Sequence, residues 1–303
     1  MATPSKLRCL QLNVGKGRNA YQNLQLDLTF DIAFIQEPST DSRGHPLDGW
    51  VDHEAFFNMV GTNRRKAVTI LRKNRFQCQL LSQFSCDNVV TVEITSDSGK
   101  FVLINIYNEK EKDIEKLIAR LEEIKTYNPK CILAGDFNAR HTLWGDTETD
   151  NRGRRMEAYI YSSGLDLFNV WDCPPTFRVQ HGNICRRSWI DSTMGRYCIV
   201  NNWRVCGDDT YSDHAMIAFD ILTVLDPGAA PRRNLYRISW PAFREGLEEM
   251  AKDLEDFLDS DEANAEEAAA MFTEACSRAI ECSAPLCGGR RNSKPQFRGR
   301  INY

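Results

Sequence analysis

A set of polar side chains in this sequence of 303 residues stands where short, apolar, strand-like runs begin or end. Such side chains can converge although they are far apart in the sequence, because the strands of a β-sandwich bring their ends together at one edge. Their carboxylate, amide, phenol and imidazole groups suit the hydrolysis of a phosphoester. The set comprises Asn13, Glu37, Tyr107, Asp136, Asn138, Asp191, Asp213 and His214.

Carboxylate and amide oxygens are the ligands that Mg²⁺ prefers, and Mg²⁺ keeps several of its waters when a protein binds it. The cation assists hydrolysis because it offsets the charge that develops on the phosphate. Glu37 is the leading candidate ligand, with Asn13 and Asp213 as further candidates. We therefore expect Mg²⁺ as the cofactor, with Mn²⁺ able to substitute.

The remaining members of the set suit proton transfer and phosphate binding. An aspartate beside a histidine fixes the tautomer of the imidazole and stabilises its charged form, which would couple Asp191 to His214. Asp136 would then orient or deprotonate the attacking water, while Asn138 and Tyr107 hold phosphate oxygens. Each residue alone also has an ordinary interpretation, since Asp and Asn after a strand are usually turn formers. The joint arrangement favours the chemical interpretation.

These residues must be positioned by the elements around them. Residues 113–127 have a helical apolar stripe, and a second helix is expected over residues 154–163. Many strands and few helices predict an α/β fold in which two sheets pack face to face with helices outside. Strands are expected over residues 7–14, 32–35, 67–71, 76–81, 89–94, 101–107, 131–134, 176–179, 188–193, 203–205 and 215–221.

The composition changes at residues 226–231, which read Asp-Pro-Gly-Ala-Ala-Pro and predict a linker. We expect a catalytic domain over residues 1–225 and an extension over residues 226–303. The extension has acid-rich amphipathic helices expected over residues 240–258 and 263–282, followed by a basic tail that we expect to be mobile.

The overall composition excludes several classes of protein. No apolar run is long enough to span a bilayer, and the first residues lack the apolar segment of a secretion signal. The eleven cysteines are scattered and form no zinc-binding spacing, so we expect reduced thiols. A net charge of −4 gives no general sign of nucleic-acid binding. We expect a nuclear protein, made in the cytoplasm, with no membrane partner.

Taken in order, Asn13, Gln36-Glu37, Tyr107, Gly135-Asp136-Phe137-Asn138, Ser188 with Asp191, and Ser212-Asp213-His214 form a recognisable series. The series resembles the exonuclease–endonuclease–phosphatase superfamily, which includes abasic-site endonucleases, DNase I, inositol polyphosphate phosphatases and deadenylases. The resemblance covers about residues 7–222. It implies a four-layer α/β/β/α sandwich of the DNase I type, and it implies the ligand, acid–base and phosphate-binding roles given above. Thr176 and Ser188 match secondary phosphate-side positions of the family.

Further segments resemble the endonuclease domains of insect non-LTR retrotransposons that target ribosomal DNA or telomeres. They are residues 138–145 (Asn-Ala-Arg-His-Thr-Leu-Trp-Gly), 151–153 (Asn-Arg-Gly), 175–177 (Pro-Thr-Phe) and 188–193 (Ser-Trp-Ile-Asp-Ser-Thr). The helical extension resembles the region that precedes a reverse transcriptase, of which this sequence contains no motif.

This resemblance implies an endonuclease that nicks one strand of double-stranded DNA and leaves a 3′-hydroxyl to prime reverse transcription. Its further partners would be the element RNA and a reverse transcriptase domain in the full-length protein. Tyr107 is followed by Asn-Glu-Lys, not by the Pro-Asn of abasic-site repair enzymes, which disfavours a repair function. The expected DNA-facing residues are Arg64, Arg65, Lys66, His141, Trp144, Arg186 and Arg187. Core packing is an equal alternative for Trp144.

Two other functions share this site. A phosphatase or phosphodiesterase acting on inositol phosphates or lipids would need a membrane-facing apolar or basic loop, and no convincing one is present. A DNA-binding module with a degenerate site is the other alternative, and the complete residue set argues against it.

Overall fold

The computed structural model describes residues 6–26, 29–60, 64–96, 99–182, 184–207, 210–223, 233, 238–259 and 264–285. The chain divides into two compact units, residues 1–230 and 231–303. The predicted linker and the predicted basic tail lie outside the described residues.

The first sheet of unit 1 has the strand order β13-β14-β1-β2-β4-β3. β1 (Lys6–Asn13) lies near its centre, parallel to β2 (Ile32–Gln36) and antiparallel to β14 (Ile217–Leu222). Its apolar residues are buried on both faces, as expected of a strand covered on both sides. The remaining strands are β3 (His53–Phe56), β4 (Ala67–Arg72) and β13 (Ile199–Val205).

The second sheet has the order β5-β6-β7-β8-β12-β9. β7 (Gly99–Tyr107) and β8 (Cys131–Asp136) are parallel, and β12 (Asp191–Arg196) is antiparallel to β8. Each sheet therefore contains one parallel pair whose carboxyl ends coincide. The other strands are β5 (Gln77–Leu80), β6 (Val89–Ser96) and β9 (Asp166–Leu167).

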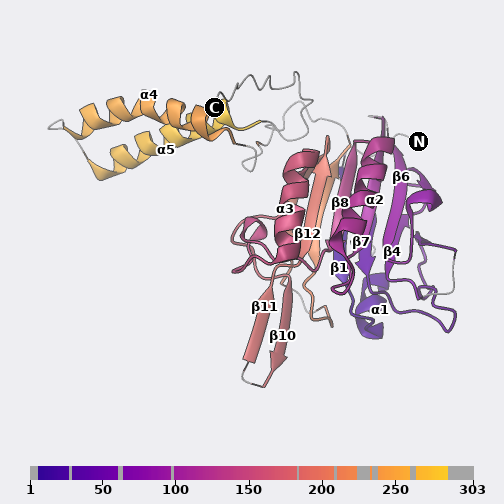
Figure 1. Cartoon of the computed structure of the whole chain (residues 1–303). Helices are drawn as coiled ribbons and strands as arrows, with labels where there is room; N and C mark the ends of the chain where they lie inside the picture. The colour runs from indigo at the N-terminus through magenta and orange to yellow at the C-terminus, as the bar shows by residue number, and fades with distance from the viewer. Residues whose placement is uncertain are drawn as a thin grey trace, which may run out of the picture. The chain divides into compact units, whose positions relative to one another are not determined.

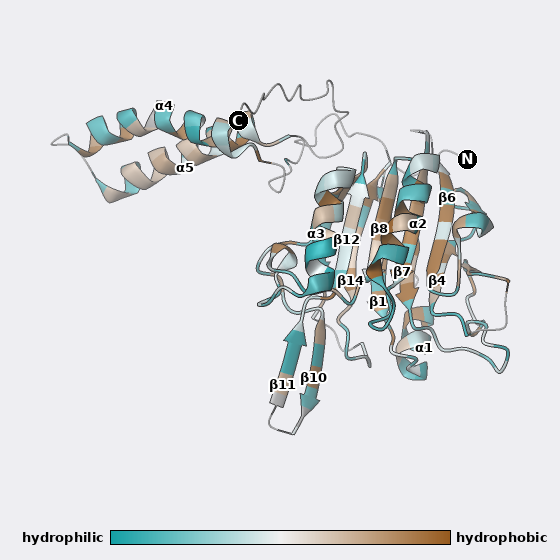
Figure 2. Cartoon of the chain, viewed as in Figure 1, coloured by the Kyte–Doolittle hydropathy of each residue, from teal (hydrophilic) through white to brown (hydrophobic). Residues whose placement is uncertain are grey.

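The alternation of side chains along the strands builds a core between the two sheets and two further apolar layers outside them. Phe34 of the first sheet and Leu103 of the second belong to the inner core, whereas Ile104 lies on the opposite face of its strand. α1 (Arg18–Leu26) covers the outer face of the first sheet, and α2 (Ile114–Tyr127) and α3 (Asn151–Ser163) lie over the second (Figure 1). The four-layer α/β/β/α architecture is thus confirmed, with brown apolar strands inside and teal helix surfaces outside (Figure 2).

Helix capping fixes where the two outer helices begin. The Asp113 side chain accepts a hydrogen bond from the backbone N–H of Glu115, which starts α2 as the apolar stripe predicts. The Asp150 side chain accepts from Gly153 N at 2.6 Å, so α3 begins at Asn151, one turn before the predicted start. Gly164, at φ 66°, ends α3 in the left-handed conformation that favours glycine.

The strand predicted over residues 188–193 is correct only from Asp191 onward. β11 (Ile184–Ser188) ends before it and pairs with β10 (Phe177–His181) in a separate hairpin, and β12 begins at Asp191. The break occurs because Asp146 accepts a hydrogen bond from the backbone N–H of Trp189, which cannot then pair with a strand. The β10–β11 hairpin projects away from the sheets (Figure 1). The predicted elements do not include α1, β3, β9 or residues 184–187 of β11.

The described residues of unit 2 form two helices, α4 (Trp240–Leu258) and α5 (Ala265–Ser283), which follow the predicted ranges closely. They approach closely at Gly246, whose missing side chain leaves room for Ala279. Among the described residues, no helix is both long and apolar enough to cross a membrane.

Candidate active site

The carboxyl ends of the two parallel strand pairs bring the predicted site residues together. In the first sheet, Asn13 pairs with the residue before Glu37, across β1 and β2. In the second sheet, Tyr107 lies opposite Asp136, and Asp191 at the start of β12 lies opposite the same aspartate. These residues therefore converge because of strand register, as the positions of polar residues at the strand ends predicted.

Asp136 is the central acidic group of this cluster, and it is buried. Its Oδ2 accepts a hydrogen bond of 3.0 Å from the amide of Asn13, and its Oδ1 accepts one of 2.9 Å from the backbone N–H of Asn138. The Asn13 amide is itself oriented, because its Oδ1 accepts from Gly15 N at 2.9 Å. These bonds fix the orientation of the carboxylate, each contributing about 1.5–3 kcal/mol when it involves a charged group.

His214 lies between two aspartates. Its Nδ1 is 2.9 Å from Oδ2 of Asp191, and its Nε2 is 3.9 Å from Oδ2 of Asp136. Potential ligand atoms of the three residues all lie within 4.8 Å of one another. The ring of Phe177 packs edge-on against the imidazole, with 4.8 Å between the ring centroids. The imidazole is therefore held by one carboxylate and presented to the other.

Glu37 approaches from the other sheet and has left-handed backbone geometry at φ 45°. Its Oε2 is 2.9 Å from Nζ of Lys16. Burial works against the charged form, but hydrogen bonds from Tyr107, Lys16 and Asn13 outweigh it and lower the pKa of Glu37. Burial and the neighbouring Glu37 raise the pKa of the Tyr107 phenol well above its ordinary value. At neutral pH the site thus presents a charged carboxylate beside a neutral phenol.

The pKa values of the buried residues Asp136 and His214 are both raised. Burial, followed by repulsion from Asp191, raises the pKa of Asp136 to about 7 although His214 opposes the shift. Burial alone would lower the pKa of His214, but the two aspartates outweigh it and raise that pKa to about 9. The surrounding side chains therefore do not provide enough positive charge to keep the Asp136 carboxylate fully ionised at neutral pH.

A divalent cation fits this donor set. Glu37, Asp136 and Asn13 offer the hard oxygen donors that such cations prefer. Asp191 Oδ1 is buried and has no hydrogen-bond partner among the described residues. A cation bound among these oxygen atoms would favour the charged form of Asp136 and so offset the cost of burying its carboxylate.

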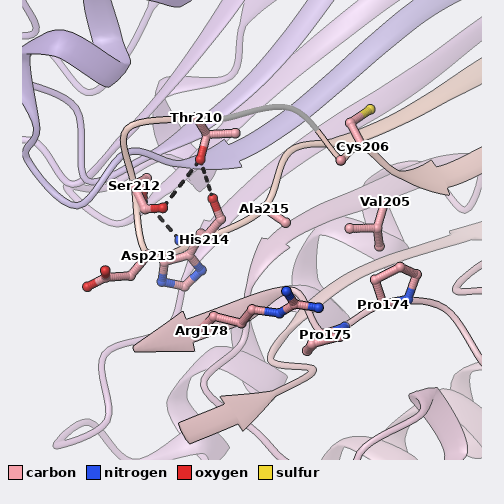
Figure 3. Close-up of a pocket in the computed structure, with 11 residues that line it drawn as sticks. Pro174, Pro175, Arg178, Val205, Cys206, Thr210, Ser212, Asp213, His214 and Ala215 are labelled. Carbon is pink, nitrogen blue, oxygen red and sulfur yellow. Dashed lines mark hydrogen bonds between the residues drawn. The ribbon is translucent and has the colours of Figure 1, made fainter. Parts of the chain in front are cut away.

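The loop that carries His214 is tied to the first sheet and to the hairpin. Ser212 Oγ donates to the backbone carbonyl of Asn13 at 2.7 Å, and Thr210 Oγ1 donates to the carbonyl of His214 at 2.7 Å. Asp213 is exposed, and its backbone carbonyl accepts from Arg178 N at 2.8 Å, which anchors β10 to the loop. Figure 3 shows Arg178 and two prolines facing this loop across a pocket.

The two predicted phosphate-side residues lie in different surroundings. Thr176 is buried, and its Oγ1 accepts a hydrogen bond of 3.1 Å from the backbone N–H of Asp191. Ser188 is half-buried at the end of β11, opposite Phe177. Thr176 thus supports the start of β12 from beneath, and Ser188 lies at the base of the hairpin.

Some of the residues expected to face DNA are exposed and others are buried. Arg64 is exposed, but Arg65 is 1% exposed and points inward to the carbonyl of Asn58 and to Asp87. Arg65 therefore holds two loops together and is not a surface group. Arg186 and Arg187 are exposed on β11, and Lys66 is half-buried and paired with Glu109.

His141 and Trp144 are buried as well. His141 Nε2 is 3.2 Å from Glu157 of α3, and Trp144 donates its indole N–H to the carbonyl of Ala139 at 3.1 Å. For Trp144 the core-packing alternative describes the structure. Both side chains shape the segment after Asn138.

A chain of buried amides beneath the site was not predicted. Gln36 donates to Asn105 Oδ1 at 2.7 Å, and Gln11 donates to the carbonyl of Gly135 at 3.1 Å. Thr193 Oγ1 donates to Gln11 Oε1 at 3.1 Å. These contacts link the two sheets directly below Asp136. Polar residues within otherwise apolar strands are the sequence signal that could have revealed them.

The sequence matches the endonuclease–reverse transcriptase family over residues 101–218, which include Tyr107, Asp136, Asp191 and His214. No match was found among curated proteins.

Among solved structures, the fold is similar to the endonuclease domain of TRAS1, a telomere-specific non-LTR retrotransposon. The two chains are 28% identical with a TM-score of 0.64, over 73% of this chain and 100% of the other. The fold also resembles the AP endonuclease LMAP of Leishmania major, at 13% identity and a TM-score of 0.53, over 73% of this chain and 89% of the other. A third similar structure is D. rerio TDP2 complexed with a single-stranded DNA product, at 16% identity and a TM-score of 0.51, over 73% of this chain and 100% of the other.

Proposed function

We propose that this chain, which belongs to the exonuclease–endonuclease–phosphatase superfamily as an endonuclease of the retrotransposon type, is a Mg²⁺-dependent enzyme that nicks DNA and leaves a 3′-hydroxyl. The observation that supports the proposal is the position of His214, between Asp191 and Asp136, beside the charged carboxylate of Glu37. The nicked end would prime reverse transcription.

The residues divide the work of hydrolysis. Asp136 accepts the proton of the water that attacks the phosphorus, because its carboxylate is buried and oriented by Asn13. His214, protonated through its contact with Asp191, donates a hydrogen bond to a phosphate oxygen and stabilises the charge that develops there. The amide of Asn138 and the phenol of Tyr107 hold further phosphate oxygens.

Glu37 and Asn13 would hold the Mg²⁺ ion, and the carboxylate of Asp136 would remain free to act on the attacking water. When bound, the ion supplies Lewis-acid stabilisation of charge on the phosphate and on the leaving 3′-oxygen. Asp213 is an exposed carboxylate at the rim of the same pocket as Glu37 and would act on the hydration shell of the ion.

The similarity to the endonuclease–reverse transcriptase family supports the proposed partners. The substrate would be double-stranded DNA in the nucleus, and the chain would act with a reverse transcriptase domain and the element RNA. Exposed Arg64, Arg186 and Arg187 are the proposed DNA-facing cations.

Incubation of the chain with supercoiled plasmid and Mg²⁺ tests the proposal. Relaxed circles are expected from the wild type, their formation is abolished by EDTA, and a polymerase extends their 3′ ends without prior phosphatase treatment. The variants Glu37→Gln, Asp136→Asn and His214→Ala should each slow nicking by about 10²-fold or more.

Glu123→Gln is the matched control, because Glu123 is an exposed helix carboxylate outside the site. Its nicking rate should equal that of the wild type. Intact plasmid together with turnover of a soluble inositol phosphate would favour the phosphatase alternative. Equal nicking by all variants would reject this site.

A further inference from the structure

The side chain of Arg152, in the first turn of α3, contacts five backbone carbonyls. Its Nε donates to Asn138 O at 2.9 Å. Its Nη1 donates to Lys112 O at 2.6 Å and Lys110 O at 3.2 Å. Its Nη2 reaches Asn108 O and Phe137 O, each at 3.4 Å. A guanidinium group has five N–H donors in a fixed fork, so this environment matches its full donor inventory.

The five carbonyls belong to two loops that carry site residues. Residues 108–112 follow Tyr107 at the end of β7, and residues 137–138 follow Asp136 at the end of β8. Arg152 therefore forms a joint between the loops that follow the carboxyl ends of β7 and β8. Asn108 reinforces the joint, because its backbone N–H donates to the carbonyl of Asp136 at 2.8 Å.

The joint also stabilises an unfavourable backbone conformation. Asn138 has φ 47°, in the left-handed region that L-residues rarely adopt and that asparagine adopts more readily than most. Its N–H is held by the Asp136 carboxylate and its carbonyl by Arg152 Nε. The two bonds fix the peptide units on either side of Asn138, and through them the direction of its side-chain amide.

We propose that Arg152 is a positioning residue that sets the geometry of Asn138 and Tyr107 relative to Asp136. The proposal rests on the proposed nuclease function. It assigns Arg152 to the chemical step and not to DNA binding. All three nitrogens of its guanidinium already donate to backbone carbonyls, so Arg152 could bind a phosphate only by giving up those hydrogen bonds.

Single-turnover nicking of a short duplex tests the proposal with Arg152→Lys and Arg152→Gln. Lysine keeps the charge but cannot reach five carbonyls from one nitrogen. Both variants should nick at least about tenfold more slowly, because small displacements of catalytic groups have large effects on rate. Their Kd for DNA and its salt dependence should equal those of the wild type.

Arg154→Gln is the matched control, because this substitution removes the same charge two residues away. Among the described residues, the guanidinium of Arg154 contacts only the nearby Thr149 and Asn151. It should nick at the wild-type rate. A rate restored by Arg152→Lys together with a salt slope reduced by about one in Arg152→Gln would overturn the proposal, because that is the behaviour of a phosphate contact.

A second measurement does not depend on activity. In the NMR spectrum of the wild type, the Nε–H of Arg152 should exchange slowly with water, and Arg152→Lys should shift the backbone and side-chain amide signals of Asn138. Rapid exchange of the Nε–H would overturn the proposal even if a variant failed to fold. If the wild type did not nick plasmid, the proposed function would fail, while slow exchange and the Asn138 shifts would still establish the positioning contact.

Discussion

The Nδ1 atom of His214 lies 2.9 Å from Oδ2 of Asp191, and both side chains are buried. The two residues come from different sheets, since Asp191 begins β12 and His214 precedes β14. Their contact keeps a proton on Nδ1 and leaves Nε2 directed at Asp136. The imidazole is thus oriented before any substrate binds.

Asp191→Asn should remove this orientation and slow nicking by about 10²- to 10⁴-fold. Asparagine keeps the shape of the side chain but loses the charge that raises the pKa of His214. The pKa should fall from about 9 toward or below 6.5, and an NMR titration of the His214 ring measures it. A rate and a pKa unchanged from the wild type would show that Asp191 has no influence on His214.

The pH dependence of stability should reflect His214. Its pKa is raised from 6.5 to about 9 in the folded protein, so the folded state binds the proton more tightly than the unfolded state. The resulting stabilisation is present in full below pH 6.5 and is lost as pH rises through about 9. Chemical denaturation of the metal-free protein should show this loss, and His214→Gln should lack it. Parallel curves for the two proteins would contradict the prediction.

Mg²⁺ affinity should rise with pH around neutrality. Burial and Asp191 raise the pKa of Asp136 to about 7, so this carboxylate gains the negative charge that attracts a nearby cation only as the pH rises through that value. The increase in Tm on adding Mg²⁺ should therefore be larger at pH 8 than at pH 6. In Asp136→Asn the increase should be small at both values. A wild-type increase that does not change with pH would mean that the charge of Asp136 does not stabilise the bound cation.

Arg64 and Arg65 should give opposite results on substitution. Arg64→Ala removes an exposed cation and should weaken DNA binding, reduce its salt slope by about one and leave stability unchanged. Arg65→Ala leaves Asp87 without its buried partner and should lower the free energy of unfolding by about 3 kcal/mol. DNA binding and urea denaturation of both variants separate the two effects. Loss of affinity in Arg65→Ala without loss of stability would show that it reaches DNA.

Gly135→Ala should prevent stable folding or lower the free energy of unfolding by more than about 3 kcal/mol. Gly135 has φ 154°, and a Cβ there would lie 1.9 Å from the carbonyl oxygen of Ile106 in the neighbouring strand. Gly207→Ala is the control, because no atom lies within 4 Å of its added Cβ. Thermal denaturation of both variants measures the difference. Equal Tm values would imply that β7 and β8 can separate at no cost.

The proximity of the candidate site residues could be predicted from the sequence because it depends on local signals. Asn13, Glu37 and Asp136 interrupt or follow apolar runs, and the ends of parallel strands coincide in any sheet that contains them. The polar groups were therefore visible as exceptions to the strand pattern. Their convergence required only that the two sheets pack face to face.

Residues whose role depends on a distant partner could not be predicted in this way. Arg65 resembles its neighbour Arg64 in sequence, and only the distant Asp87 decides that it points inward. The Ser188–Asp191 region alternates as one strand would, but Asp146, more than forty residues earlier, binds Trp189 N and divides it. The same holds for Arg152, which looks like part of a surface cluster until its five carbonyl partners are seen.

The pairing of β1 with β14 has a consequence for synthesis of the protein. Lys6 lies opposite Leu222, so β1 is synthesised long before β14, the strand with which it pairs. Contacts across so much of the chain are slow to form, because the closure of a long loop must precede them. The first sheet is therefore complete only after residue 222 has emerged from the ribosome. Until then, the exposed edge of β1 is a target for chaperones or for mispairing with another nascent chain.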